Sequence, residues 1–262
     1  GGITGDEVTL LNAGQGTFAQ TEVGTGIEVT TSMQLSGADA GNYSLTGQPS
    51  GLTADITKAP LTVTADDQEK TYDGESFSGF TASYSGFVDG EDPDDLEGTL
   101  AFATNPEGPV LETGTWEIIP SGLSSDNYAI TFENGELKIK KATLTVTADN
   151  KTKDYDGQVF SPFTASFSGF VNNEDETVIS GAVDYTGNAK NAVNAGNYLI
   201  IPVTDDLNAV NYAFTAEEGT LTINKVNARI TVNGFDGVYD GLSHGATGNA
   251  TGVNGESLKG LD

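Results

Sequence analysis

Apolar and polar residues alternate with a period of two along most of this chain. Leu61, Val63 and Ala65 are separated by threonines, and residues 128–132 and 144–148 show the same alternation. Neighbouring side chains of a β-strand point to opposite faces, so this period indicates strands with one buried face. No helical stripe is longer than two turns. The pattern predicts an all-β protein in which two small sheets pack face to face.

A second local signal predicts a hairpin. Asn134-Gly135 lies between the alternating residues 128–132 and a further alternating pair, Leu137 and Ile139. An Asn-Gly pair in this setting is typical of a two-residue hairpin turn, because both turn positions need a positive φ. Glu218-Gly219 occupies the same place about 84 residues later. We therefore expect a hairpin near 134–135 and another near 218–219.

The alternating runs belong to a tandem repeat. The stretch Lys58–Asp66 recurs as Lys141–Asp149, 83 residues further on, and a third start follows at Lys225. Fixed periodicity of this kind indicates copies of one folding unit. We predict four segments: 1–57, the C-terminal part of a repeat; 58–140 and 141–224, two whole β-sandwich repeats; and 225–262, the N-terminal part of a further repeat.

The junctions between repeats contain no spacer. Alternation continues almost unbroken from Glu136 to Ala148 and again from Leu221 to Val232. A flexible linker would need Gly/Ser-rich or Pro-rich composition, which is missing at both places. We therefore expect short, stiff junctions and an elongated array of Ig-like β-sandwich repeats.

Charge and composition narrow the classes of partner. The 262 residues include 38 acidic and 11 basic ones, for a formal net charge of -27, and no cysteine. Such a charge repels nucleic acid and anionic membranes, because binding to either requires Lys and Arg. Without cysteine there are no disulfides, thiol nucleophiles or zinc–thiolate sites. No stretch is long enough to insert into a membrane. No signal peptide opens the chain, so a secreted parent protein would carry its signal upstream.

Three recurring motifs resemble a known family. They are Tyr-Asp-Gly, the element Gly114-Thr115-Trp116 with its counterpart Gly196-Asn197-Tyr198, and a closing Asn-Tyr pair seen in Asn127-Tyr128. Their order and spacing are similar to the MBG and YDG repeats of bacterial surface adhesins. Residues 1–57 resemble the end of a YDG-type repeat, and 58–224 resemble two MBG-type repeats. The resemblance implies tandem Ig-like β-sandwiches in long secreted or surface-anchored bacterial proteins, without catalytic residues.

The Tyr-Asp-Gly motif has two interpretations. It could contact a ligand, or its Asp-Gly pair could form a tight turn while the tyrosine packs over the edge of the sandwich. The second interpretation is the one we expect. The motif occurs three times: Tyr72, Asp73 and Gly74; Tyr155, Asp156 and Gly157; Tyr239, Asp240 and Gly241.

Two acidic loops are candidates for calcium. Calcium takes six to eight oxygen ligands, which clustered carboxylates can supply, although neither loop fits the EF-hand pattern. The alternative is a pair of solvated loops. The candidate ligands are Asp89, Glu91, Asp92, Asp94 and Asp95 in one loop and Glu174, Asp175 and Glu176 in the other. No other cofactor is expected.

The remaining polar and aromatic residues do not indicate catalysis. Trp116 and Tyr198 could form carbohydrate platforms, or they could be buried. His244 is the only histidine, and no motif places a Ser or Asp partner beside it. Chance pairs of carboxylates are unavoidable with so many acids, so they do not indicate a glycosidase. We predict that the protein is not an enzyme.

These observations lead to one functional prediction and one alternative. The chain is expected to be a structural stalk segment of a long extracellular bacterial adhesin or surface filament, which extends a functional tip from the cell surface. Its partners would be neighbouring repeats of the same chain. The alternative is a multivalent, low-affinity module that binds glycan or a host or abiotic surface. An exposed aromatic patch common to both repeats would favour the alternative, and buried aromatic residues would favour the stalk.

Overall fold

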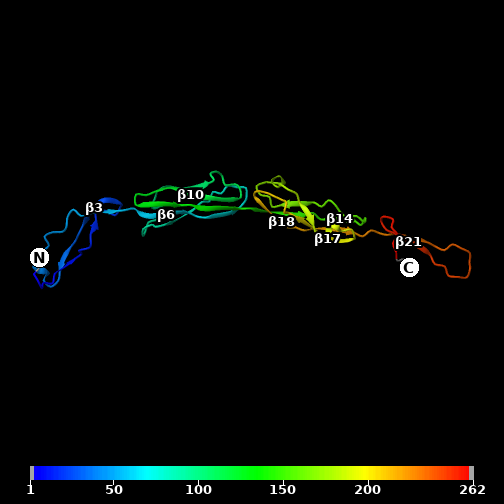
Figure 1. The fold of residues 1–262 in the computed structure, drawn as a ribbon, viewed down its shortest axis with the longest axis horizontal. Helices are drawn as coiled ribbons and strands as arrows, with labels where there is room; N and C mark the ends of the chain where they lie inside the picture. Colours follow the sequence, from blue (N-terminus) through cyan, green and yellow to red (C-terminus); the bar gives the residue numbers. More distant parts are fainter. Residues whose placement is uncertain (1–2, 260–262) are drawn as a thin grey trace. The chain divides into compact units, whose positions relative to one another are not determined.

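A computed structural model describes residues 3–259, which form β-strands joined by loops and four short 3-10 turns (Figure 1). The all-β prediction is confirmed. The strands are β1 (Thr9–Leu11), β2 (Thr17–Phe18), β3 (Gly24–Thr30), β4 (Gln34–Ser36), β5 (Thr53–Ile56), β6 (Ala59–Ala65), β7 (Gln68–Thr71), β8 (Ala82–Ser85), β9 (Glu97–Asn105), β10 (Gly114–Ser124), β11 (Tyr128–Glu133), β12 (Gly135–Lys140), β13 (Ala142–Ala148), β14 (Lys151–Asp154), β15 (Ala165–Ser168), β16 (Asp184–Thr186), β17 (Gly196–Val203), β18 (Tyr212–Glu217), β19 (Gly219–Asn224), β20 (Arg229–Asn233) and β21 (Thr247–Thr251). The 3-10 turns are η1 (Ala40–Asn42), η2 (Pro93–Asp95), η3 (Glu176–Val178) and η4 (Asn188–Asn191).

The strands contact one another in two compact units. One comprises the residues up to 68 together with 77–109 and 115–137, and the other comprises 69–76, 110–114 and the residues from 138 on. The second unit therefore includes two short segments of the first predicted repeat. Among residues 3–259, no helix is of the length and apolar character that crossing a membrane requires.

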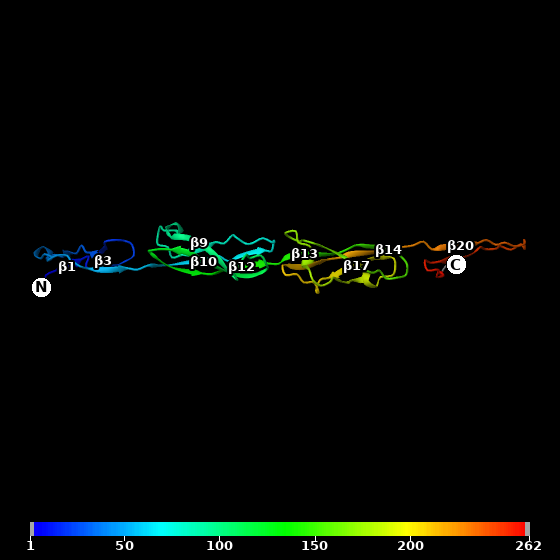
Figure 2. The same ribbon diagram turned by 90° about the horizontal axis from the view of Figure 1, so that it is seen from above.

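Each of the two stretches 58–140 and 141–224 forms a three-stranded and a four-stranded sheet. In the first stretch the orders are β11-β6-β8 and β7-β12-β10-β9. In the second they are β18-β13-β15 and β14-β19-β17-β16. Figure 2 labels β13 of the three-stranded sheet and β14 and β17 of the four-stranded one. The two orders correspond strand for strand, so both copies of the repeated sequence adopt one topology.

The apolar positions predicted from the period of two form the cores. Leu144 and Val146 are fully buried on β13, as Leu61 and Val63 are on β6, whereas the threonines between them face outward or are half-buried. Burial of a side chain of this size stabilises a fold by about 1.5–3 kcal/mol. In the second repeat Ile200, Leu221 and other residues extend this core, and Phe160, Phe163 and Tyr185 pack against it.

The predicted hairpins at 134–135 and 218–219 are wrong. β11 pairs with β6 in parallel, with Ile130 opposite Leu61, and β12 belongs to the other sheet. The chain therefore crosses between sheets at Gly135. Its φ is not positive; instead, a Cβ there would lie 2.4 Å from the carbonyl oxygen of Ala65. A Cβ on Gly219 would likewise lie 2.3 Å from the carbonyl oxygen of Ala148. Glycine is present because two backbones approach closely.

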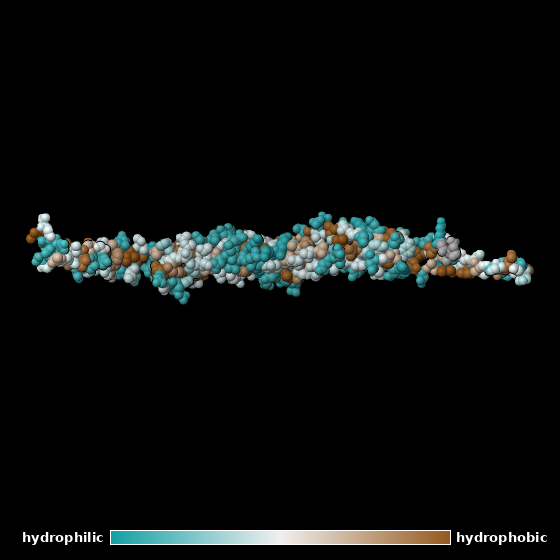
Figure 3. All heavy atoms as spheres, turned by 90° about the horizontal axis from the view of Figure 1, so that it is seen from below, coloured by the Kyte–Doolittle hydropathy of each residue, from teal (hydrophilic) through white to brown (hydrophobic). Residues whose placement is uncertain are grey.

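The flanking segments each carry part of this topology. The N-terminal segment, 1–57, contains the sheet β2-β3-β5 and the pair β1-β4. The C-terminal segment, 225–262, contains β20 paired antiparallel with β21, with Ile230 opposite Ala250. Figure 3 shows brown, apolar atoms at the surface of the C-terminal segment. Ile230 and Val232 are exposed in this segment, whereas their counterparts in the second repeat, Val146 and Ala148, are buried.

Candidate functional site

The three Tyr-Asp-Gly motifs form the same turn. The aspartate side chain accepts a hydrogen bond of 2.9 Å from the backbone N–H two residues later, at Glu75, Gln158 and Leu242. The glycine then takes a φ of 78°, 76° and 77°, a conformation that favours glycine. The preceding tyrosines differ in burial: Tyr72 is buried and Tyr155 is half-buried, whereas Tyr239 is 94% exposed.

Tyr72 is buried within the second unit. Its N–H donates to the carbonyl of Lys140, 2.8 Å away, and its hydroxyl donates to Glu174 Oε1 at 2.6 Å. Its ring meets the ring of Tyr212 edge to face, with centroids 5.6 Å apart. Tyr72 belongs to the first repeated sequence, whereas Glu174 and Tyr212 belong to the second. The motif therefore packs onto the following copy.

Glu174 binds a second tyrosine with its other oxygen. The hydroxyl of Tyr212, a buried residue at the start of β18, donates to Glu174 Oε2. The same hydroxyl accepts a hydrogen bond of 3.1 Å from the N–H of Val171. One carboxylate thus joins two buried phenols, and hydrogen bonds to a charged acceptor are stronger than those between neutral groups. We call Tyr72, Glu174 and Tyr212 the tyrosine clamp.

Part of the clamp recurs earlier in the chain. Tyr128 donates to Glu91 and accepts from the N–H of Val88 at 3.0 Å. In the N-terminal segment, Tyr43 donates to Asp6 and accepts from the N–H of Ile3, at 2.5 Å and 3.0 Å. The N–H donor and the acid are three residues apart in all three copies. The tyrosine of each Asn-Tyr pair therefore fixes one loop of its own repeat.

The asparagine of the pair makes a separate contact. Asn211 Oδ1 accepts a hydrogen bond of 3.0 Å from the N–H of Thr113, whose hydroxyl donates to the carbonyl of Val210 at 2.9 Å. In the first unit Asn127 Oδ1 accepts from the N–H of Val23 at 3.1 Å. In both cases the donor lies in the preceding copy of the repeated sequence.

A close approach adds to the contact around the clamp. Asn172 Nδ2 donates to the carbonyl of Gly74 at 3.3 Å, and a Cβ on Gly74 would lie 2.4 Å from the Asn172 side chain. Asn254 repeats this contact with the following motif, because its Nδ2 donates to the carbonyl of Asp156 at 3.0 Å. The small glycine therefore serves the turn and the packing at once.

The environment of the clamp keeps its tyrosines protonated. The hydrogen bond to Glu174, followed by burial, raises the pKa of Tyr72 to about 12. Burial, followed by the hydrogen bond to Glu174, raises the pKa of Tyr212 above its usual value. Burial and the bond to Glu91 act on the pKa of Tyr128 in the same direction. Each phenol is held as a hydrogen-bond donor, which is what a carboxylate partner requires.

The acidic loops proposed for calcium serve other contacts. Glu91 and Glu174 accept from tyrosines, as described above. Asp92 and Asp95 form a capping box around η2, and Asp175 accepts from the N–H of Thr177 at the start of η3. Within residues 3–259, no three acidic or histidine side chains gather where they could hold a metal ion. Calcium binding by these residues stays a prediction.

The aromatic residues proposed as carbohydrate platforms are half-buried. Tyr198 packs against the core of the second repeat, and its hydroxyl donates to the carbonyl of Asn194 at 2.8 Å. Trp116 is also half-buried. From residue 58 to 224 every aromatic side chain is buried or half-buried. No exposed aromatic patch is common to the two copies.

Sequence reasoning missed the partners of the tyrosines. Glu91 and Glu174 stood out only as members of acidic loops, and Asn127 and Asn211 only as part of a family motif. A signal was present, because an acid follows three residues after Ile3, Val88 and Val171 in every copy that contains an Asn-Tyr pair. Periodicity alone could not show that Tyr72 pairs with an acid 102 residues away.

Solved structures similar to this chain contain β-sandwich modules. Fibronectin(III)-like modules of CbhA from Clostridium thermocellum share 17% identity over 62% of this chain and 94% of theirs, with a TM-score of 0.21. Drosophila N-cadherin EC1-4 shares 10% identity over 86% of this chain and 67% of its own, with a TM-score of 0.27. The N-terminal four Ig domains of Dscam1 share 11% identity over 76% of this chain and 54% of theirs, with a TM-score of 0.24. Similarity this low supports no conclusion about partners. No curated protein matches the chain.

Family models match most of the chain. The MBG domain (YGX type) matches residues 61–138 and 144–222, which together exceed half of the sequence. The YDG domain matches residues 1–51. The two MBG matches coincide with the two stretches that share one sheet topology, and the resemblance seen in the motifs is confirmed. The chain belongs to the MBG domain (YGX type) family, with a YDG domain preceding two tandem MBG copies.

Proposed function

We propose that this chain is a stalk segment of a long extracellular bacterial adhesin or surface filament. The observation that carries the proposal is the tyrosine clamp. The most distinctive side chains of the repeat, Tyr72, Glu174 and Tyr212, contact one another across successive copies of the sequence. Residues that join repeats suit a protein whose task is to extend a chain of domains.

The distribution of aromatic side chains supports the same function. A repeat that binds glycan would be expected to present aromatic rings to solvent, whereas residues 58–224 present none that is fully exposed. The net charge of -27 adds to this argument, because like charge on neighbouring chains discourages lateral aggregation. We propose no catalytic role, because the one carboxylate of the clamp, that of Glu174, accepts hydrogen bonds from two tyrosine hydroxyls.

The proposal includes the domain boundaries and the location. We propose repeat units at 58–140 and 141–224, flanked by partial repeats at 1–57 and 225–262, on the outside of a bacterial cell. An antibody raised against residues 58–224 should label intact cells of the native host. Labelling only after permeabilisation would contradict the location.

A replacement experiment in the parent protein tests the stalk function. Deleting residues 141–224 should reduce adhesion of the cells, and inserting an unrelated β-sandwich of equal length should restore it, because a stalk supplies length alone. Binding repeats would behave differently: the unrelated domain would not restore adhesion. A second measurement tests binding of the purified 262-residue chain to glycan arrays, host cells and abiotic surfaces. A stalk segment should bind to none of them.

A further inference from the structure

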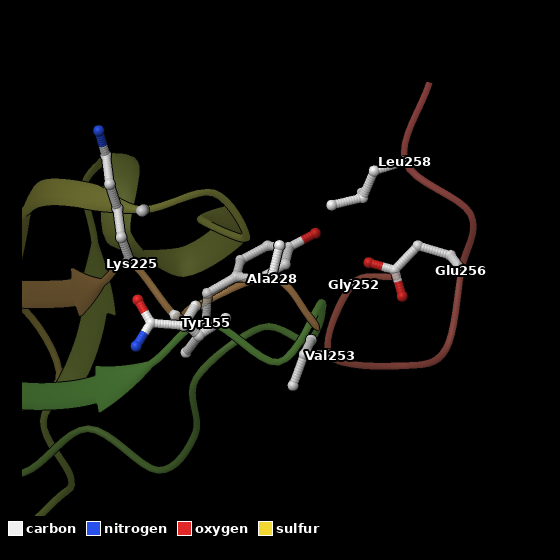
Figure 4. Close-up of a pocket in the computed structure, with 10 residues that line it drawn as sticks. Tyr155, Lys225, Ala228, Gly252, Val253, Glu256 and Leu258 are labelled. Atoms are coloured by element: carbon white, nitrogen blue, oxygen red, sulfur yellow. The ribbon is translucent and has the colours of Figure 1, made fainter. Parts of the chain in front are cut away.

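Two extended segments of the second repeat run side by side through both of its sheets. β13 pairs with β18 in one sheet, β14 pairs with β19 in the other, and both pairs are parallel. The register is the same in both pairs, because each residue lies opposite the one 70 positions later in the sequence. In Figure 4 the arrows that end beside Tyr155 and Lys225 point the same way. We call residues 142–155 the entry segment and residues 211–224 the exit segment.

Backbone hydrogen bonds close the ladder at both of its ends. The N–H of Ala142 donates to the carbonyl of Asn211 at 3.0 Å, one residue before β18 begins. At the other end, the N–H of Tyr155 donates to the carbonyl of Asn224, also at 3.0 Å. The entry segment is therefore bonded to the exit segment from its first residue to its last.

A side chain bridges the place where the two segments cross from one sheet to the other. Asn150, between β13 and β14, accepts a hydrogen bond of 2.7 Å on its Oδ1 from the N–H of Thr220. The first unit contains the equivalent bond, because Asp67 Oδ1 accepts from the N–H of Glu136 at 2.8 Å. The crossing therefore leaves no gap in the ladder of hydrogen bonds.

Further side-chain bonds join the same strands. The hydroxyl of Thr147 on β13 donates to Glu217 on β18 at 3.1 Å. In the first unit β6 pairs in parallel with β11, and the hydroxyl of Thr64 donates to Glu133 at 3.0 Å. Both copies of the repeat thus join an early strand to a late one in the same direction and with the same kind of polar contact.

This pairing determines how the repeat responds to tension along the backbone. The chain enters the second repeat next to Ala142 and leaves it after Asn224. Tension draws the entry segment toward its N-terminal end and the exit segment toward its C-terminal end. Because the segments are parallel, the two pulls oppose each other along the ladder and load its evenly spaced bonds together. In an antiparallel pair the same pulls would open the bonds one at a time.

We propose that the entry and exit segments form a load path that resists shear, so that the second repeat transmits tension without unfolding. Residues 156–210 lie between the two segments in the sequence, and they bear no tension until the ladder breaks. The load path goes beyond the stalk function, which requires length alone, because it assigns resistance to force to particular strands. The parallel pairing of β6 with β11 extends the same role to the first repeat.

Pulling single molecules of the 262-residue chain in two directions tests the load path. The chain has no cysteine, so introduced pairs define the points of attachment. Thr143→Cys with Lys225→Cys loads the segments in shear, whereas Thr143→Cys with Val210→Cys separates their neighbouring N-terminal ends. All three positions are exposed. We expect an unfolding force at least about twofold higher in shear, because bonds that are loaded together must break together. Equal forces, or a lower force in shear, overturn the proposal.

A pair of matched substitutions locates the resistance in the ladder. Asn150→Ala removes the bond that bridges the crossing. Asn188→Ala is the control, because Asn188 Oδ1 likewise accepts from a backbone N–H, that of Leu199 at 2.6 Å, outside both segments. Under constant shear force, Asn150→Ala should unfold about fivefold faster than the wild type, because its bond breaks in the step that tension drives. Asn188→Ala should unfold at the wild-type rate.

Two outcomes of the substitutions contradict the load path: an unchanged unfolding rate in Asn150→Ala, and an equal acceleration in Asn188→Ala. Thermal unfolding without force verifies that both variants are folded. The comparison of pulling directions leaves the ladder itself unaltered, so it decides the question even if Asn150→Ala does not fold. None of these results would alter the outcome of the replacement experiment, so the two proposals fail separately.

Discussion

Glu174 holds one tyrosine hydroxyl on each of its two oxygens, and the two tyrosines come from different copies of the repeat. A single side chain therefore links the Tyr-Asp-Gly motif of one copy to the Asn-Tyr motif of the next. Hydrogen bonds to charged groups contribute about 1.5–3 kcal/mol to stability, and a buried acceptor that loses its donor costs a similar amount. The free energy that the clamp contributes is thus a large fraction of the total stability of a small domain, which is about 5–15 kcal/mol.

Replacing Tyr72 with Phe should destabilise the second compact unit by about 1.5–3 kcal/mol, because the ring contact with Tyr212 remains while the bond to Glu174 is lost. Chemical denaturation followed by far-UV circular dichroism measures the change. The matched control is Tyr185→Phe, which removes a half-buried hydroxyl that has no hydrogen bond among the described residues. If Tyr185→Phe lowers the free energy of unfolding as much as Tyr72→Phe does, the hydrogen bond of the clamp contributes no more than an unpaired hydroxyl.

Alkaline pH should weaken the clamp. The pKa of Tyr72 is about 12 in the folded chain and close to 10 in an unfolded one. Because the folded-state pKa is the higher, the stabilisation is fully present below about pH 10 and is lost as the pH rises towards about 12. Denaturation at a series of pH values should show a decline above about pH 10 that is smaller in Tyr72→Phe. Identical declines in the two proteins would contradict the assignment.

At the scale of elements, the strands were predictable and their pairing was not. The period of two at Leu61, Val63 and Ala65 places the buried face of β6 correctly, because alternation depends on neighbouring residues only. The pairing of β11 with β6 joins residues nearly 70 positions apart, and no local pattern reports it. Asn134-Gly135 looked like a hairpin because glycine suits both a positive φ and a close backbone approach, and the second reason applies here.

Substituting Gly135 tests that explanation. Gly135→Ala should destabilise the first unit by about 1–3 kcal/mol, because the new Cβ would lie 2.4 Å from the Ala65 carbonyl oxygen and the backbone must shift. Gly79→Ala is the control, since its Cβ would meet only the Phe77 ring, at 3.5 Å, and its φ is not positive. It should be neutral or slightly stabilising. Thermal unfolding of both variants measures the two effects, and a Gly135→Ala variant as stable as Gly79→Ala would contradict the close backbone approach.

At the scale of the molecule, the compact units do not coincide with the sequence repeats. Residues 69–76 and 110–114 pack with the second repeat although they belong to the first repeated sequence. Sequence comparison finds where a pattern starts again, whereas packing follows contacts such as those of Tyr72 and Thr113. The folding of one repeat is therefore expected to depend on the next, as in other repeat arrays where neighbour contacts supply part of the stability.

The stiff junctions expected from the sequence lead to a prediction for the whole chain in solution. Only Lys141 separates β12 from β13, and the junction has none of the Gly/Ser or Pro content of a linker. A compact globule of 262 residues would have a radius of gyration of about 18 Å. Small-angle scattering at low protein concentration should give a clearly larger value if successive repeats extend the chain.

Raising the salt concentration separates two causes of a large radius of gyration, because it screens the repulsion expected from a net charge of -27 but leaves short covalent junctions unchanged. A large value that persists in salt supports stiff junctions, a value that collapses in salt assigns the extension to charge, and a value near 18 Å at low salt contradicts an elongated array.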